Sequence, residues 1–105
     1  MRLDKDDFFG LFDAWKDEVD KLLILFQKKH ESYGPDNISA TGINGIIIRM
    51  WDKINRLRRR IIENNPETLT DEQLVDSLAD IANYAIIGLL LLHNIWPEFD
   101  EKGEN

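Results

Sequence analysis

Three polar residues in the last third of the chain fall at a spacing that puts them on one face of a helix. Asp76, Asp80 and Asn83 are separated by four and three residues, so their side chains lie one above another. Two carboxylates at this spacing repel each other on a bare helix, but they suit a bound cation, and Mg²⁺ prefers oxygen ligands. The spacing makes Asp76 and Asp80 candidate Mg²⁺ ligands. A solvated acidic face near a helix N-terminus is the alternative explanation.

A second charged group lies in the middle of the chain. Its members are Arg49, Asp52, Lys53 and Arg56, which follow one another at steps of three, one and three residues. This helix face carries an excess of positive charge, although Asp52 and Arg56 also fit a simple ion pair four residues apart. The ring of Trp51 can stack on a base, with a place in the core or an interface as the alternative. The pattern is typical either of a binding face for a small polyphosphate or of a solvated face.

Three long helices must position these residues, because apolar side chains recur at steps of three and four in three separate segments. The helices are predicted over residues 5–30, 41–64 and 71–95, with a loop over residues 32–37. Gly10 weakens the start of the first helix, so this segment is either one helix or two. Thr70 and Gln73 form the pattern of a capping box at the start of the third helix. The sequence therefore predicts an all-α fold.

The third predicted helix is apolar on every side between residues 85 and 92. Three helices have difficulty covering such a segment all round, so we expect a homo-oligomeric helical bundle, a dimer or larger. The 105 residues suffice for one domain, expected over residues 1–97, and residues 98–105 are expected to form a flexible acidic tail.

Composition limits the partners and the compartment. A net charge of −7 makes the chain a poor binder of duplex nucleic acid, which requires many neutralised phosphates. There is no cysteine, and the N-terminus carries acids where a secretory signal would carry a basic stretch, so a cytoplasmic location is expected. The apolar run over residues 81–95 is interrupted by Asn83 and His93 and is shorter than a bilayer span, so no membrane is expected.

Three separated blocks of the sequence share their order with a known family. They are Lys28-Lys-His-Glu-Ser-Tyr-Gly34, Arg49-Met-Trp-Asp-Lys-Ile-Asn-Arg56 and Asp76-Ser-Leu-Ala-Asp-Ile-Ala-Asn-Tyr-Ala85. They resemble the phage nucleotide-modification-associated domain family, whose pattern has a lysine-rich approach to an aromatic–glycine pair, an arginine followed by Asp-Lys and another arginine, and an acid-rich helix. The resemblance covers residues 25–92. For a phage-encoded protein it implies the host cytoplasm.

This family is in turn similar to the all-α nucleoside triphosphate pyrophosphatases, the MazG-like and dimeric dUTPase group. The resemblance implies Mg²⁺ held by acids of two helices, with catalytic and metal-binding roles for Asp52, Asp76 and Asp80. The ligand-binding residues that it implies are Lys28, Tyr33, Arg49, Trp51, Lys53, Arg56, Asn83 and Tyr84. The hydrolases carry two or more glutamates in the earlier metal helix, whereas this chain has Asp52 alone there. Asp17 and Glu18 compensate only if the first helix packs beside the site.

Three functions follow as hypotheses. The first is a phage-type nucleotide-binding protein, either a Mg²⁺-dependent (deoxy)nucleoside triphosphate pyrophosphohydrolase or a degenerate relative; in the enzyme, the metal polarises the phosphate and lowers the pKa of an attacking water. The second is a non-catalytic sponge that sequesters a cyclic signalling nucleotide to counter host defence, which the excess of basic residues in the second helix favours. The third is a structural helical oligomer whose polar faces are only solvated.

Overall fold

The computed structural model describes residues 3–97, which contain helices and no strand. The elements follow one another as α1 (Phe8–Tyr33), α2 (Asp36–Ser39), α3 (Gly42–Leu57), the π-helical segment η1 (Arg58–Ile62) and α4 (Asp71–Leu92). The prediction of an all-α fold with three long helices is therefore confirmed. The tail expected over residues 98–105 lies outside the described residues.

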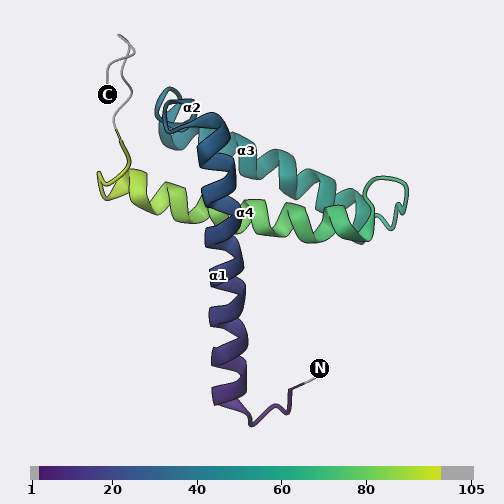
Figure 1. The fold of residues 1–105 in the computed structure, drawn as a ribbon. Helices are drawn as coiled ribbons and strands as arrows, with labels where there is room; N and C mark the ends of the chain where they lie inside the picture. The colour runs from purple at the N-terminus through teal and green to yellow at the C-terminus, as the bar shows by residue number, and fades with distance from the viewer. Residues whose placement is uncertain (1–2, 98–105) are drawn as a thin grey trace.

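Helices α3 and α4 lie side by side, and α1 crosses them so that its N-terminal half extends well beyond the pair (Figure 1). The core sits at the end of the pair that carries α2. Ile46 of α3 is 1% exposed and packs with the other buried members of the core cluster, which are Ile38, Ile87 and Trp96. The C-terminal half of α1 adds Phe26 to this cluster. The crossing of α1 with α4 therefore lies beside the core.

Helix α1 is continuous from end to end. It is capped by Asp7, whose carboxylate accepts a hydrogen bond from the backbone N–H of Gly10 at 2.8 Å, and Gly10 does not break it. It ends at Gly34, which adopts φ +70° and donates its N–H to the His30 carbonyl at 2.7 Å. This positive φ favours glycine and closes the helix three residues after the predicted end.

The loop predicted over residues 32–37 is in part wrong, because α1 runs through Tyr33 and the short helix α2 begins at Asp36. Pro35 precedes α2 with a helical φ of −79°, which suits the start of a helix, where a proline loses no intrahelical hydrogen bond. The indole N–H of Trp96 donates to the Pro35 carbonyl at 3.2 Å. This contact links the turn between α1 and α2 to the segment that follows α4.

The connection between α3 and α4 is held by side chains at both ends. Arg60 of η1 donates to the Leu69 carbonyl and to the Asp71 carboxylate, each at 3.0 Å. The predicted capping box is present: the Thr70 hydroxyl accepts from the Gln73 N–H at 3.1 Å, and the Gln73 side chain accepts from the Thr70 N–H at 2.9 Å. These contacts fix where α4 starts, and therefore which of its residues face α3.

Helix α4 is long and apolar enough to cross a membrane when judged by length and composition alone. The central helix of a helical bundle has the same properties. Only 28% of its most apolar 18-residue stretch is buried within this chain. Helix α3 covers one side of α4, and much of the rest is exposed.

Candidate functional site

The most closely connected polar cluster joins the three long helices at Asp80 of α4. Its Oδ1 accepts from Nζ of Lys29, on α1, at 2.5 Å, and its Oδ2 lies 3.1 Å from Nζ of Lys53, on α3. The Asp80 side chain is only 10% exposed, whereas those of Lys29 and Lys53 are 47% and 25% exposed. A buried carboxylate is therefore held between two ammonium groups that reach solvent.

Helical spacing explains why these three side chains meet. Lys29 follows Phe26 by three residues, and Lys53 follows Met50 by three, so each lysine lies on the side of its helix that packs on the core. The Asn83 amide, three residues after Asp80, donates to the Leu22 carbonyl of α1 at 3.1 Å. This hydrogen bond fixes the crossing of α1 and α4 next to the cluster.

Electrostatics favour the ionised form of Asp80. Burial by itself raises the pKa of this carboxyl, because a charge loses solvation. The hydrogen bonds from Lys29 and Lys53, together with their positive charges, outweigh burial and hold the pKa below its ordinary value. Asp80 is thus a carboxylate at neutral pH, and it is a weak proton acceptor.

A cavity of about 290 Å³, which we call the aromatic cavity, opens on one side of this cluster. Its lining residues come from α1, α2, α3, α4 and the segment after α4, and they are Phe26, Lys29, His30, Tyr33, Gly34, Asn37, Ile38, Arg49, Lys53, Asp80, Asn83, Tyr84, Ile87 and Trp96. Five of them carry aromatic rings, while lysines, an arginine and two amides supply polar groups. Such a lining suits a ligand with a flat ring and polar edges.

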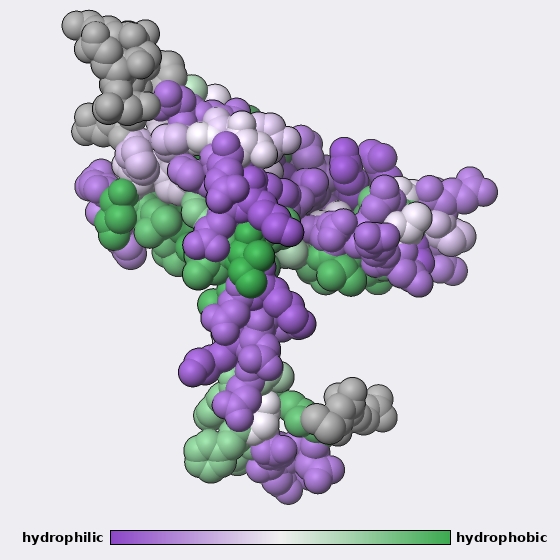
Figure 2. Space-filling view, viewed as in Figure 1, coloured by the Kyte–Doolittle hydropathy of each residue, from purple (hydrophilic) through white to green (hydrophobic). Residues whose placement is uncertain are grey.

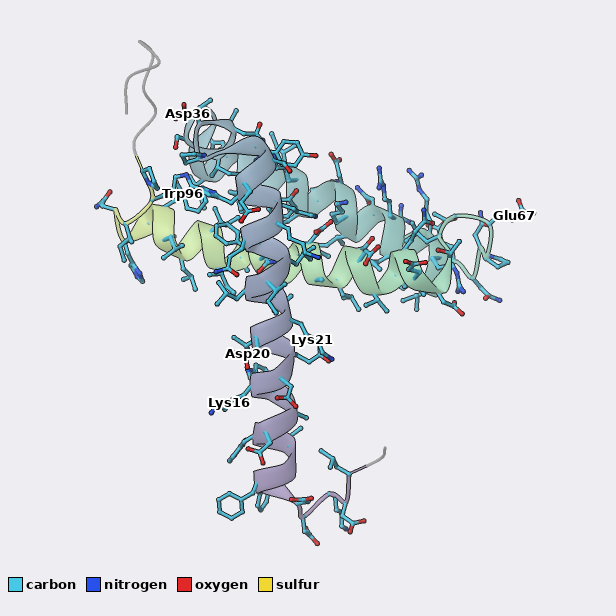
Figure 3. The ribbon with its side chains drawn as sticks, in the orientation of Figure 1. Lys16, Asp20, Lys21, Asp36, Glu67 and Trp96 are labelled. Carbon is cyan, nitrogen blue, oxygen red and sulfur yellow. The ribbon has the colours of Figure 1, made fainter. Side chains whose placement is uncertain are left out.

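Three of the rings pack against one another as one wall of the aromatic cavity. The ring centroids of Phe26 and His30 lie 5.4 Å apart, and both rings meet Trp96 edge to face at 5.9 Å. Trp96 lies beside the end of α1 that is nearer the core (Figure 3). His30 packs within this wall and also lines the cavity.

Another part of the cavity lining is held in place by Arg49. Its guanidinium donates to the Asn37 carbonyl at 3.1 Å and lies 3.4 Å from the Asn37 side-chain oxygen. These contacts leave the amide N–H groups of Asn37 as donors on the cavity wall, because its oxygen is the atom engaged. Arg49 thereby positions α2 against α3.

A second cavity of about 310 Å³, the polar cavity, lies on the other side of Asp80. It is lined by Leu25, Lys29, Lys53, Arg56, Leu69, Gln73, Asp76, Ser77 and Asp80. The two cavities share Lys29, Lys53 and Asp80, so the ionic cluster stands where they adjoin. Ser77 is 4% exposed and lines this cavity. Its hydroxyl can donate a hydrogen bond at the cavity wall.

Most of the residues singled out from the sequence come together here. Tyr33, Asn83, Tyr84 and Arg49 line the aromatic cavity, Arg56 and Asp76 line the polar cavity, and Lys53 and Asp80 line both. Lys28, Trp51 and Asp52 line neither cavity, and the Trp51 residue is 68% exposed. Sequence reasoning missed Lys29, Ser77 and Trp96. For Lys29 the signal was present, because it shares the core-facing side of α1 with Phe26.

The positions of the acids bear on the Mg²⁺ site that the resemblance implies. Within residues 3–97 no group of three or more Asp, Glu or His side chains lies close enough together to hold a metal ion. Asp76 and Asp80 line the same polar cavity, but both Asp80 oxygens already meet ammonium groups. The acids of residues 3–97 therefore do not form a ready-made carboxylate site for Mg²⁺, and Mg²⁺ binding stays a prediction. Mg²⁺ held by one or two carboxylates together with substrate phosphates agrees with its chemistry.

Comparison with known families concerns the part of the chain that forms α3, η1 and α4. Residues 41–92 match the model of a family described as Nucleotide modification associated domain 1. The match covers slightly less than half of the chain and supports a role associated with nucleotide modification. It includes Lys53 and Asp80 but not Lys29, which α1 contributes from outside the matched domain. No curated protein and no solved structure matches the chain.

Proposed function

We propose that this protein binds a nucleotide across its two cavities, with the base in the aromatic cavity and the phosphates in the polar cavity. The observation that carries the proposal is the ionic cluster of Lys29, Asp80 and Lys53 at the place where the cavities adjoin. Together the cavities reach about 600 Å³, within the range of roughly 300–1,000 Å³ that is typical of small-molecule sites.

The aromatic cavity supplies what a base needs. Tyr33, Tyr84 and Trp96 offer ring surfaces for stacking, and base–aromatic stacking contributes about 1–3 kcal/mol per base. The amide of Asn37 and the free Oδ1 of Asn83 provide a donor and an acceptor, since the Asn83 nitrogen is occupied by the Leu22 carbonyl. A flat heterocycle with both donors and acceptors on its edge can therefore stack on these rings and form hydrogen bonds with the two amides.

The polar cavity supplies what phosphates need. Lys29, Lys53 and Arg56 contribute three positive charges, and Asp76 and Asp80 two negative ones. The Ser77 hydroxyl adds a neutral donor. Charge-assisted hydrogen bonds from lysine and arginine to phosphate are the strong class of hydrogen bond. In this proposal Asp80 holds the two lysine side chains in place before the ligand arrives, so less side-chain entropy is lost on binding.

A Mg²⁺-dependent cleavage of the bound nucleotide is the second candidate. It is favoured by Asp76 and Asp80, which line the polar cavity together at the spacing of one helical turn. Against it stands the low pKa of Asp80, because a carboxylate of low pKa is a poor general base. Capture without cleavage needs only the cationic and aromatic groups, and it is therefore the function we place first.

Calorimetric titration with a nucleoside, its monophosphate and its triphosphate, in Mg²⁺ and in EDTA, tests both candidates. Affinity that rises with each phosphate, survives EDTA and leaves the ligand intact by ³¹P NMR supports capture. Monophosphate and pyrophosphate that form only in Mg²⁺, and not in the Asp80→Ala variant, support cleavage. Absence of binding across a panel that includes cyclic dinucleotides refutes the proposal.

The Lys53→Met variant tests the placement of the phosphates. We expect the triphosphate to bind at least about tenfold more weakly, because a hydrogen bond to a charged group contributes about 1.5–3 kcal/mol. Affinity for the nucleoside is expected to change much less. Lys21→Met is the matched control, since Lys21 lies on α1, lines neither cavity and pairs with Glu18. An equal loss for nucleoside and triphosphate would contradict the assignment of the phosphate subsite.

A further inference from the structure

The N-terminal part of α1, residues 8–24, which we call the arm, has little of this chain to pack against. No residue of α1 is buried, although the helix is 26 residues long. Figure 1 shows the arm extending away from α3 and α4, and Figure 3 shows Lys16, Asp20 and Lys21 along it, away from the other helices. An isolated helix of this length is marginal in water and normally depends on tertiary packing for its stability.

One side of the arm is a continuous apolar stripe. Its members recur at steps of three and four along the helix, and those most exposed are Phe8 (61%), Phe12 (58%), Trp15 (71%), Val19 (43%) and Leu23 (53%). The carboxylates of the arm lie elsewhere: helical spacing puts Asp13, Asp17 and Asp20 on the opposite side. Covering the stripe therefore leaves these acids in water.

Helix α4 carries a matching stripe. The exposed members, again at helical spacing, are Val75, Leu78, Ile86, Leu89 and Leu92, and each is between 43% and 67% exposed. Spacing places them opposite the side on which Ser77, Asp80 and Gly88 are buried. Figure 2 shows apolar surface along the edge of the α3–α4 pair from which the arm projects. The two stripes thus border the angle between the arm and α4. We call this angle, lined by the ten side chains, the apolar corner.

We propose that a second copy of this chain fills this corner, with the arm of each copy lying in the corner of the other. The ten side chains expose on the order of 80–100 Å² each, about 800–1,000 Å² per chain. A stable interface buries about 800 Å² per partner, and a monomer rarely exposes an apolar patch above roughly 600 Å². Each chain carries both surfaces, so reciprocal docking about a two-fold axis closes as a dimer.

The composition of the corner favours a second copy over a membrane. The ten stripe residues include no charged side chain, which is typical of the core of an obligate homodimer interface. The back of the arm carries Asp13, Asp17 and Asp20, and an anionic lipid surface repels carboxylates. A copy of the chain is also present wherever the chain is made. The inference does not depend on nucleotide binding.

Sedimentation velocity of the full chain without nucleotide tests the proposal. We expect the wild type to sediment at twice the single-chain mass of 12.3 kDa, and Trp15→Glu and Leu89→Glu to shift it to a single chain at the same concentration. Ile24→Glu is the matched control: Ile24 is 54% exposed on the back of the arm, so this variant stays dimeric. Circular dichroism at 222 nm shows whether each variant remains helical.

A second measurement serves in case the glutamate variants do not fold. The chain has no cysteine, so a Phe12→Cys, Leu89→Cys double variant reports on proximity alone, and mild oxidation is expected to give a covalent dimer. A Lys16→Cys, Leu89→Cys variant, whose first cysteine lies at the edge of the stripe, is expected to cross-link less. A wild type that is a single chain at tens of micromolar overturns the proposal, as does a single chain that sediments with phosphatidylcholine–phosphatidylglycerol vesicles.

Discussion

Replacing Asp80 with asparagine tests the electrostatic role given to the ionic cluster. The substitution keeps the shape of the side chain but removes the charge that Lys29 and Lys53 share. Breaking a fully buried ion pair costs about 3–5 kcal/mol, whereas exposed pairs contribute about 0–1 kcal/mol. Asp80 is 10% exposed and its lysine partners 47% and 25%. We therefore expect the free energy of unfolding to fall by about 1–2 kcal/mol at pH 7, an intermediate value.

The charge of Asp80 also predicts how the difference in stability between wild type and Asp80→Asn changes with pH. The pKa of Asp80 is lowered in the folded chain, so its ionisation stabilises the fold at pH values above the ordinary carboxyl pKa of about 3.9. This contribution disappears as the pH falls through the lower pKa of the folded state, where Asp80 takes up a proton. The stability of wild type and Asp80→Asn is thus expected to differ at pH 7 and to converge below about pH 3.9.

Urea denaturation followed by circular dichroism at 222 nm, at pH 7 and at pH 3, measures both quantities. Asp76→Asn is the control, because Asp76 lies one turn earlier on α4, is exposed, and has no ion-pair partner among residues 3–97. Its effect is expected to stay within about 0.5 kcal/mol. An Asp80→Asn variant as stable as wild type at pH 7, or a difference equally large at both pH values, would refute the reasoning.

Two further predictions concern the ends of helices. Thr70→Ala removes the acceptor of the Gln73 N–H at the start of α4 and is expected to lower the free energy of unfolding by about 1 kcal/mol, with Thr70→Ser close to wild type. Gly34→Ala is expected to cost about 1–2 kcal/mol in the same urea experiment, because alanine is strained at φ +70°, although no atom lies within 4 Å of the added Cβ. Gly34→Asn is expected to cost less, since asparagine tolerates this backbone region.

The helices were predictable because their signals are local. Apolar periodicity located α1, α3 and α4, and four residues, Thr70 to Gln73, specified the start of α4 through a capping box. The segment around Pro35 was misjudged, since a proline both ends one helix and starts another. The contact from the Trp96 indole to the Pro35 carbonyl joins residues 61 apart and helps to hold this turn, and no local pattern encodes it.

The candidate site was predicted best where a motif placed the residue on the correct side of its helix. Lys53 and Asp80 fulfil this condition. Trp51, Asp52 and Lys28 do not line the cavities, because neighbouring residues on a helix differ by about 100° in direction. A motif that spans consecutive residues therefore cannot tell which of them faces a neighbouring helix. That choice depends on how α1 crosses α4, which no local pattern encodes.

The distribution of charge around the two cavities limits the size of the ligand. The chain carries a net charge of −7, yet the cavities are lined by four cationic side chains and two carboxylates. Folding creates this local excess by bringing Lys29 of α1 next to Lys53 of α3. At physiological ionic strength the field of the remaining acids is screened beyond about 8 Å, so it barely opposes phosphates held inside the cavity. A long polyanion would have to cross the acidic surface outside it, and the arrangement therefore favours a single nucleotide over a nucleic acid.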